Sequence, residues 1–310
     1  MNYKTLIHPE LRHIAKRVPY NKMIIKCANV FQAVSLRFTG IPQEAAVRTI
    51  KIGGYKELEF KVDIFEPSGK KEKLPCLIYV HGGAFSYKAS AYHKKLACIY
   101  AVKANCRVFF PDYHLLPEYP CPAAYTDILM LYKYIMENAE GIGVNEERMG
   151  VAGDSAGAAL AALVCNHYEQ ENLKRPCLQM LVYPVTDITM QTDSMKKFSD
   201  TPLWNAKNNK RMWLYYCGKR TAEVSRDASP LQSRLPERIP DTYIETAEYD
   251  CLHDEGILYG ERLRKAGAKV TINETRGTIH GYDCALSTGV AIHNIKKRIM
   301  FLRKGFGYEA

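Results

Sequence analysis

The chain has 310 residues, of which 47% are hydrophobic and 25% charged, and its formal net charge is +10. This composition is ordinary for a globular protein and excludes a disordered or low-complexity chain. The ten cysteines form no Cys-x-x-Cys pair, which argues against a structural zinc site or a thioredoxin-type redox site. The basic residues occur in short scattered groups, so a nucleic-acid-binding role is not expected.

The sequence also bears on the cellular location. Its N-terminal segment lacks the apolar stretch of a signal peptide. No apolar run approaches the roughly 20 residues that a membrane span requires. We therefore expect a reduced, cytoplasmic protein with no stable membrane insertion.

Residues 1–45 precede the regular part of the chain and contain two amphipathic segments, 9–18 and 23–38, that are expected to be helical. From Leu74 onward, short apolar runs alternate with helical segments. Strands are predicted over residues 74–80, 107–113, 148–153, 178–185, 241–250 and 268–277. Helices are predicted over residues 95–104, 123–140, 156–168 and 253–267. This alternation predicts an α/β protein with a mostly parallel sheet that is covered on both faces.

The stretch 187–225 interrupts the alternation and holds both tryptophans, Trp204 and Trp213. We expect it to form one cap together with residues 1–45, over a core made of residues 46–186 and 226–310. Two roles are open to the aromatic side chains of this stretch. They either pack within the cap or line a route to the catalytic site.

A serine lies between two glycines in the sequence Gly153-Asp154-Ser155-Ala156-Gly157, which fits G-x-S-x-G. This pattern is typical of a sharp strand-to-helix turn that exposes a serine hydroxyl. Small flanking residues are needed because the backbone there leaves no room for side chains. The motif follows a predicted strand and begins a predicted helix, at the sheet edge where active sites of α/β proteins gather.

A nucleophilic serine needs a base, and the base needs a third group to orient it. Asp250 ends one predicted strand, and His280 follows the last predicted strand. Both would lie at the same sheet edge as Ser155. We therefore predict a catalytic triad of Ser155, Asp250 and His280.

Three neighbouring residues compete for these roles. His253 is the chief rival base, and Asp254 and Glu255 are rival acids. All three begin a predicted helix, where carboxylates are favourable against the helix dipole. This position fits a structural role better.

Acyl transfer also needs backbone N–H groups that stabilise an oxyanion. The turn His81-Gly82-Gly83-Ala84 follows the strand that ends at Val80. Its N–H groups can point inward, and the N–H of Ala156 would complete the oxyanion hole.

With these residues, the chain resembles the hormone-sensitive lipase family of α/β-hydrolase esterases. "HGGAF" is similar to the family's H-G-G-G-[FW] motif, and "GDSAG" matches its nucleophile motif. "PDYHLLPEYPCPAAYTD", "AEYDCLHDE" and "IHGY" are similar to further family motifs in the same order. The resemblance extends over about residues 55–300.

The resemblance implies an α/β-hydrolase fold with an eight-stranded, mostly parallel sheet and a helical cap. It implies Ser155 as nucleophile, His280 as base and Asp250 as orienting acid, with no metal or cofactor. The implied oxyanion donors are Gly83, Ala84 and Ala156, with Gly82 as a close contender. His81 is expected to brace the loop.

Several positions depart from the family pattern, and one of them is Leu116, which together with Leu115 makes its motif bulkier. Ala84 stands where a third glycine is usual, His114 replaces an arginine, and Cys251 replaces a proline. Cys251 and Cys284 lie near the predicted site in the sequence, so they either make activity thiol-sensitive or are simply buried.

The function implied is a serine carboxylesterase that hydrolyses short-to-medium acyl or aryl esters through a covalent acyl-enzyme. Two alternatives are an amide deacylase that uses the same triad and a non-catalytic small-ligand receptor of the same fold. The expected partner is a small-molecule ester, and a homodimer is left open.

Overall fold

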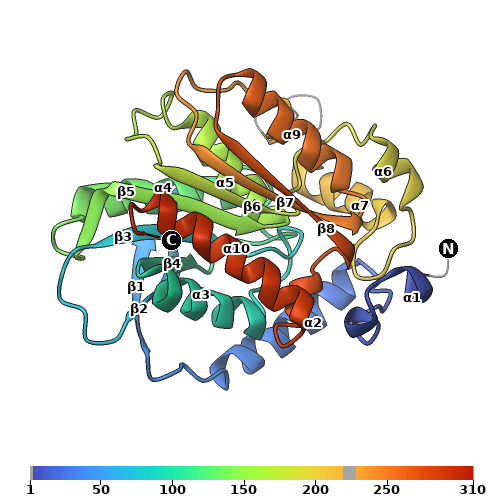
Figure 1. Ribbon diagram of the computed structural model, residues 1–310, viewed down its shortest axis with the longest axis horizontal. Helices are drawn as coiled ribbons and strands as arrows, with labels where there is room; N and C mark the ends of the chain where they lie inside the picture. The colour runs from blue at the N-terminus through green and yellow to red at the C-terminus, as the bar shows by residue number, and fades with distance from the viewer. Residues whose placement is uncertain (1–2, 219–227, 310) are drawn as a thin grey trace.

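The computed structural model describes residues 3–218 and 228–309 and is built around one eight-stranded sheet (Figure 1). The strand order is β1-β2-β4-β3-β5-β6-β7-β8. The first two strands pair antiparallel, as do β2 and β4, and every later neighbour is parallel. The strands are β1 (Ala45–Gly53), β2 (Glu59–Pro67), β3 (Leu74–Val80), β4 (Arg107–Pro111), β5 (Val144–Asp154), β6 (Leu178–Val182), β7 (Asp241–Tyr249) and β8 (Val270–Ile279).

Helices cover both faces of the sheet. Helices α3 and α10 pack on one face, and α4, α5 and α9 pack on the other (Figure 1). The helices are α1 (Tyr3–Leu6), α2 (Lys22–Arg37), α3 (Ala91–Ala104), α4 (Ala123–Asn138), α5 (Ala156–His167), α6 (Asp193–Lys197), α7 (Ala206–Cys217), α9 (His253–Lys265) and α10 (Gly289–Gly305). The α/β-hydrolase fold and its eight-stranded sheet are thus confirmed. No helix of residues 3–218 and 228–309 has both the length and the apolar character needed to cross a membrane.

The central strand β3 shows why the sheet is buried on both sides. All seven of its residues are buried. Cys76, Ile78 and Val80 pack in the hydrophobic cluster with α4 and α5, while Leu77 and Tyr79 pack in the cluster with α3 and α10. Because successive side chains point to opposite faces, a continuous apolar run is what a doubly covered parallel strand requires.

All six strands and four helices predicted from Leu74 onward are present. The hairpin of β1 and β2 was not identified from the apolar pattern, although Phe60, Val62 and Ile64 alternate along β2 in the manner of a half-buried strand. The expected helix over residues 9–18 is wrong. Only Pro9–Leu11 forms a short 3₁₀ helix, and Pro19 disfavours helical backbone for Val18.

Residues from both predicted cap stretches contact each other at the carboxyl end of the parallel strands. The Tyr3 hydroxyl donates to Asp200 at 3.0 Å, and the Tyr20 ring lies 5.5 Å from that of Trp204. Asn208 of α7 donates to the backbone carbonyl of Val18. Figure 1 shows α1, α6 and α7 gathered at this end of the sheet. Residues 219–225 of the predicted insertion, and residues 226–227 of the predicted core, lie outside the described residues.

Candidate active site

Ser155 occupies a strained turn between β5 and α5. Its backbone angles are φ 54° and ψ −120°, a conformation that non-glycine residues rarely adopt. A Cβ atom on Gly157 would lie 2.1 Å from the carbonyl oxygen of Val80, and one on Gly153 would lie 2.5 Å from the backbone of Gly157. Both flanking glycines are therefore required by the close approach of neighbouring backbone.

The structure brings the three predicted triad residues together. The Ser155 Oγ atom lies 2.9 Å from Nε2 of His280, and Nδ1 of His280 lies 2.7 Å from Oδ2 of Asp250. The other carboxylate oxygen of Asp250 accepts the N–H of Leu252 at 3.0 Å. Because the carboxylate only accepts, the His280 proton sits on Nδ1, which leaves Nε2 free to accept the serine proton.

The rival residues lie elsewhere. His253 contacts Asp254 at 2.8 Å and Glu274 at 3.2 Å. The buried Glu255 accepts backbone N–H groups of the loop that follows β6. Each of the three has structural partners of its own, and none hydrogen-bonds to Ser155 or His280 among the described residues.

Two peptide groups of the loop after β3 are held in a fixed orientation. Nδ1 of His81 donates to the carbonyl of Gly82 at 2.7 Å. The carbonyl of Gly83 accepts the N–H groups of Ser86 and Tyr87 at 2.9 and 2.8 Å. In a trans peptide the N–H points opposite to the carbonyl. The N–H of Gly83 therefore points away from His81, and the N–H of Ala84 points away from the N–H groups of Ser86 and Tyr87.

The same reasoning applies at the start of α5. The carbonyl of Ser155 accepts the N–H groups of Val185 and Ala159, both at 3.2 Å, which leaves the N–H of Ala156 directed the opposite way. By contrast, the N–H of Gly82 donates to Asp154 at 3.1 Å. Of the four candidate oxyanion donors, Gly82 is therefore the one whose N–H already donates a hydrogen bond to a carboxylate.

Ala84 adopts a φ of +54°. This left-handed backbone is the reason that glycine suits the position. The methyl group is accommodated all the same, and the side chain is buried.

Asp154 ties the nucleophile turn to the loop after β3, a role that the sequence analysis did not assign. Besides the N–H of Gly82, it accepts the Tyr79 hydroxyl at 3.0 Å and Nε2 of His93 at 3.1 Å. Nδ1 of His93 accepts the N–H of Ser90, which places the ring proton on Nε2. Burial opposes ionisation of Asp154, but the interactions with His93 and Tyr79 hold the pKa of its carboxyl below the usual value. The position of Asp154 inside the G-x-S-x-G motif is the one sequence signal for this role.

His81 is fully buried and stacks on Tyr113, with ring centroids 4.5 Å apart. Burial lowers its pKa to about 4. At neutral pH the ring is uncharged and keeps its proton on Nδ1, where the carbonyl of Gly82 accepts it.

A cavity of about 220 Å³ opens next to Ser155 and His280. Trp204 lines it, with its ring 6.2 Å from that of His280. Trp213 is buried instead and packs beside the stacked rings of Phe85 and Tyr216. Of the two roles left open by the sequence, Trp204 thus lines the space next to the catalytic residues and Trp213 packs in the interior.

The two cysteines near the site are not poised to react. Cys251 is fully buried. Cys284 lines the catalytic cavity, but burial raises the pKa of its thiol to about 12. Both thiols are therefore protonated at neutral pH and react slowly with electrophiles.

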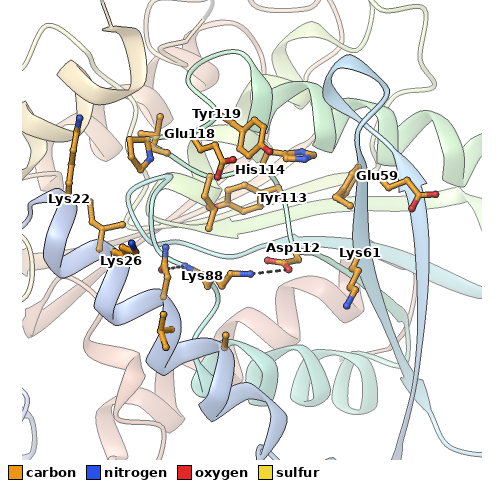
Figure 2. A pocket seen from close by; sticks show the side chains of 18 of the residues that line it. Lys22, Lys26, Glu59, Lys61, Lys88, Asp112, Tyr113, His114, Glu118 and Tyr119 are labelled. Carbon is orange, nitrogen blue, oxygen red and sulfur yellow. Dashed lines mark hydrogen bonds and ion pairs between the residues drawn. The ribbon is translucent and has the colours of Figure 1, made fainter.

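A larger cleft of about 1070 Å³ lies apart from the triad, between α2, the hairpin of β1 and β2, and residues 112–119 (Figure 2). Lys88 lines both this cleft and the catalytic cavity. His114 lies in the cleft and contacts Asp127 at 2.7 Å, which gives the residue that replaces the family's arginine a buried carboxylate partner. Within the described part of the chain, no cluster of three or more His, Cys, Asp or Glu side chains is arranged to hold a metal ion.

The family model for the α/β-hydrolase fold matches residues 77–283, which include Ser155, Asp250 and His280. The chain belongs to this family. It is 30% identical over 207 residues to the ethyl acetate hydrolase of Pseudomonas putida, a match that spans 66% of this chain and 65% of that protein. It is also 30% identical over 241 residues to the carboxylesterase NlhH of Mycobacterium tuberculosis, which spans 76% of this chain and 74% of that protein. The aligned regions thus span about 65% of the length of the first curated relatives.

Solved esterase structures share the architecture of this protein over nearly the whole chain. A bacterial heroin esterase superposes with a TM-score of 0.89 at 28% identity, covering 97% of this chain and 98% of that one. The esterase LipW from Mycobacterium marinum superposes with a TM-score of 0.89 at 26% identity, covering 99% and 98%. The predicted membership in the hormone-sensitive lipase-like branch of the family is confirmed.

Proposed function

We propose that this protein is a serine carboxylesterase that uses Ser155 as nucleophile, His280 as general base and acid, and Asp250 as the group that orients His280. The observation that carries the proposal is the continuous hydrogen-bond chain from Ser155 Oγ through His280 to Asp250, with distances of 2.9 and 2.7 Å. A non-catalytic receptor of the same fold would not need these hydrogen bonds between serine, histidine and aspartate.

In the first half of the reaction, Ser155 Oγ attacks the ester carbonyl carbon while His280 Nε2 takes the hydroxyl proton. The resulting oxyanion is held by the N–H groups of Gly83, Ala84 and Ala156, and each strong donor contributes about 3 to 4 kcal/mol. His280 then gives the proton to the leaving alkoxide, so the alcohol departs and an acyl-serine remains.

In the second half, water attacks the acyl-serine carbonyl and gives a proton to His280. Collapse of the second tetrahedral intermediate breaks the bond to Ser155 Oγ, which recovers its proton from His280. The carboxylic acid leaves and the enzyme returns to its starting state. Buried Asp250 stabilises the positive charge that His280 carries in both halves.

The size of the cavity favours short acyl or aryl esters. Its volume of about 220 Å³ is below the roughly 300–1,000 Å³ of pockets that hold drug-sized ligands. Trp204 forms part of its wall. We further propose that residues 1–45 and 187–225 act together as a cap that closes the mouth of the cavity.

Hydrolysis of p-nitrophenyl esters from acetate to decanoate tests the function. We expect kcat/KM to be highest for the short chains and to fall steeply beyond them, and Ser155→Ala to remove turnover at every length. p-Nitroacetanilide, the amide analogue, should be cleaved far more slowly than p-nitrophenyl acetate. Faster cleavage of the amide would contradict the esterase assignment, as would full ester turnover by Ser155→Ala.

A further inference from the structure

The outward face of α2 carries a continuous row of exposed apolar side chains. Met23, Phe31 and Phe38, the last just after the helix, are 73%, 73% and 83% exposed, and Val30 and Val34 are exposed between them. At 3.6 residues per turn, these five positions fall within an arc of about 100°. A single exposed apolar residue is common on protein surfaces, whereas a contiguous row marks an interaction surface. We call these five residues the apolar row.

The charges of α2 are all positive. Its sequence, KMIIKCANVFQAVSLR, contains Lys22, Lys26 and Arg37 and no acidic residue. Helical periodicity places these three on one flank of the apolar row. A helix with an apolar face and a basic border is typical of proteins that lie on anionic membranes.

The large cleft borders this same flank. Lys22 and Lys26 line one side of it, and Figure 2 shows Lys61 on the side facing them and Lys88 between the two sides. The lining contains five lysines and three carboxylates. The cleft therefore extends the positive charge of α2 onto the body of the protein.

Some of this positive charge is not neutralised within the protein. Lys88 contacts Asp112 at 3.5 Å, and another lysine of the cleft pairs with Glu59 on the neighbouring strand. Lys22, Lys26 and Lys61 have no carboxylate partner among residues 3–218 and 228–309. These lysines remain available for anions from outside, such as lipid phosphates.

The inner face of α2 forms part of the wall of the catalytic cavity. Gln32 lines the cavity and donates to the Ser90 hydroxyl at 3.0 Å. Asn29 donates to the carbonyl of Ser86 and accepts the N–H of Lys88, both at 2.8 Å. One helix thus presents its outer side to the surroundings and its inner side to the reaction site.

We propose that α2 docks this protein reversibly on anionic lipid bilayers. The apolar row enters the boundary between headgroups and acyl chains, and Lys22, Lys26 and Arg37, together with the lysines of the cleft, contact the lipid phosphates. This arrangement brings the catalytic cavity next to the membrane, where apolar esters accumulate. Docking itself requires no chemistry at Ser155 and stands independently of the proposed function.

Co-sedimentation with vesicles tests the proposal. The protein should partition onto phosphatidylcholine vesicles that contain phosphatidylglycerol and far less onto phosphatidylcholine alone, and added salt should release it. Phe31→Ser with Phe38→Ser should weaken partitioning by at least about tenfold. Lys22→Gln with Lys26→Gln should weaken binding to the anionic vesicles by about fivefold per lysine.

Leu258→Ser with Met300→Ser is the matched control, because both residues are exposed apolar side chains on other helices, α9 and α10. This variant should bind as the wild type does. Circular dichroism melting confirms that each variant folds. Turnover of p-nitrophenyl acetate in solution, measured in parallel, separates a failure of docking from a failure of the proposed esterase function.

Two results would overturn the proposal. One is that the wild-type protein does not bind the anionic vesicles, or that the variant with Phe31→Ser and Phe38→Ser binds them as tightly as the wild type does. The other is a dimer in solution that these substitutions dissociate without any vesicle binding. The apolar row would then be the contact surface for a second copy of the chain.

Discussion

Nδ1 of His81 donates to the carbonyl oxygen of Gly82 at a distance of 2.7 Å. Because the peptide is planar and trans, this bond directs the N–H of Gly83 to the opposite side. Stacking on Tyr113 holds the histidine ring in place. We infer that His81 positions an oxyanion donor without touching the substrate.

Replacing His81 should therefore affect the rate more than substrate binding. We expect His81→Ala to lower kcat by about 10- to 100-fold, since a misdirected oxyanion donor loses much of its value, while KM changes little. His81→Asn should recover part of the rate, because its amide N–H can replace Nδ1. Steady-state kinetics on p-nitrophenyl acetate with melting controls measure this, and a folded His81→Ala enzyme with wild-type kcat would refute the role.

Burial of His81 also predicts a pH dependence of stability. Its pKa falls from the usual 6.5 to about 4 in the folded protein. Between these values the unfolded chain binds a proton at this histidine and the folded protein does not. The stability contributed by this residue is therefore fully present above pH 6.5 and is lost as the pH falls toward 4, by up to roughly 3 kcal/mol.

Urea unfolding of wild type and His81→Asn across this pH range checks the prediction. The variant lacks the titrating group, so its free energy of unfolding should fall less steeply between about pH 6.5 and about pH 4. Parallel curves for the two proteins would show that His81 does not titrate as described.

The close approach at Gly157 predicts a large effect of a single methyl group. Gly157→Ala would place Cβ 2.1 Å from the carbonyl oxygen of Val80 and 2.5 Å from that of His81, both of which are backbone atoms that cannot rotate away. We expect a loss of at least about 3 kcal/mol in the free energy of unfolding. Gly40→Ala is the control, because no atom lies within 4 Å of its added Cβ. Equal stability of the two variants would contradict the geometry of the turn.

A buried charge network links α10 to the loop that carries His280. Arg298 donates to Asp283 at 2.6 Å and to Glu245 at 3.1 Å. The Tyr183 hydroxyl also donates to Asp283, and its ring packs 4.6 Å from that of His280. Although burial opposes ionisation, Arg298 holds the pKa of Glu245 below its usual value.

Removing the cation should leave two buried carboxylates without a cationic partner. We expect Arg298→Met to lower the free energy of unfolding by about 3–5 kcal/mol. Adding Glu245→Gln and Asp283→Asn should restore part of this loss, because the uncompensated charges are then gone. Chemical denaturation of the three proteins measures the effect, and an Arg298→Met variant as stable as wild type would show that the network contributes nothing.

The parts of the fold and site that the sequence predicted are those governed by local pattern. The run 74–80 is apolar throughout because both faces of β3 are covered, and the glycines of G-D-S-A-G are required by the backbone around Ser155. The order of Ser155, Asp250 and His280 follows from successive parallel strands that end at the same edge.

The parts that were missed depend on contacts between distant segments. Asp154 meets the N–H of Gly82 and the ring of His93 only after three separate elements have packed together. The sequence also leaves Gly82 among the oxyanion candidates, because it does not show which way a peptide in a flexible turn is rotated. The hairpin of β1 and β2 lies at the edge of the sheet, where exposed polar residues dilute the apolar signal.

The most direct test of the central claim is reaction with a labelled fluorophosphonate, followed by peptide mapping. An activated serine forms a covalent phosphonyl ester, whereas an ordinary serine hydroxyl is too weak a nucleophile. We predict stoichiometric labelling at Ser155, and its loss in His280→Ala although the serine is still present. Labelling at another residue, or none in the folded wild-type protein, would contradict the proposal that Ser155 is the catalytic nucleophile.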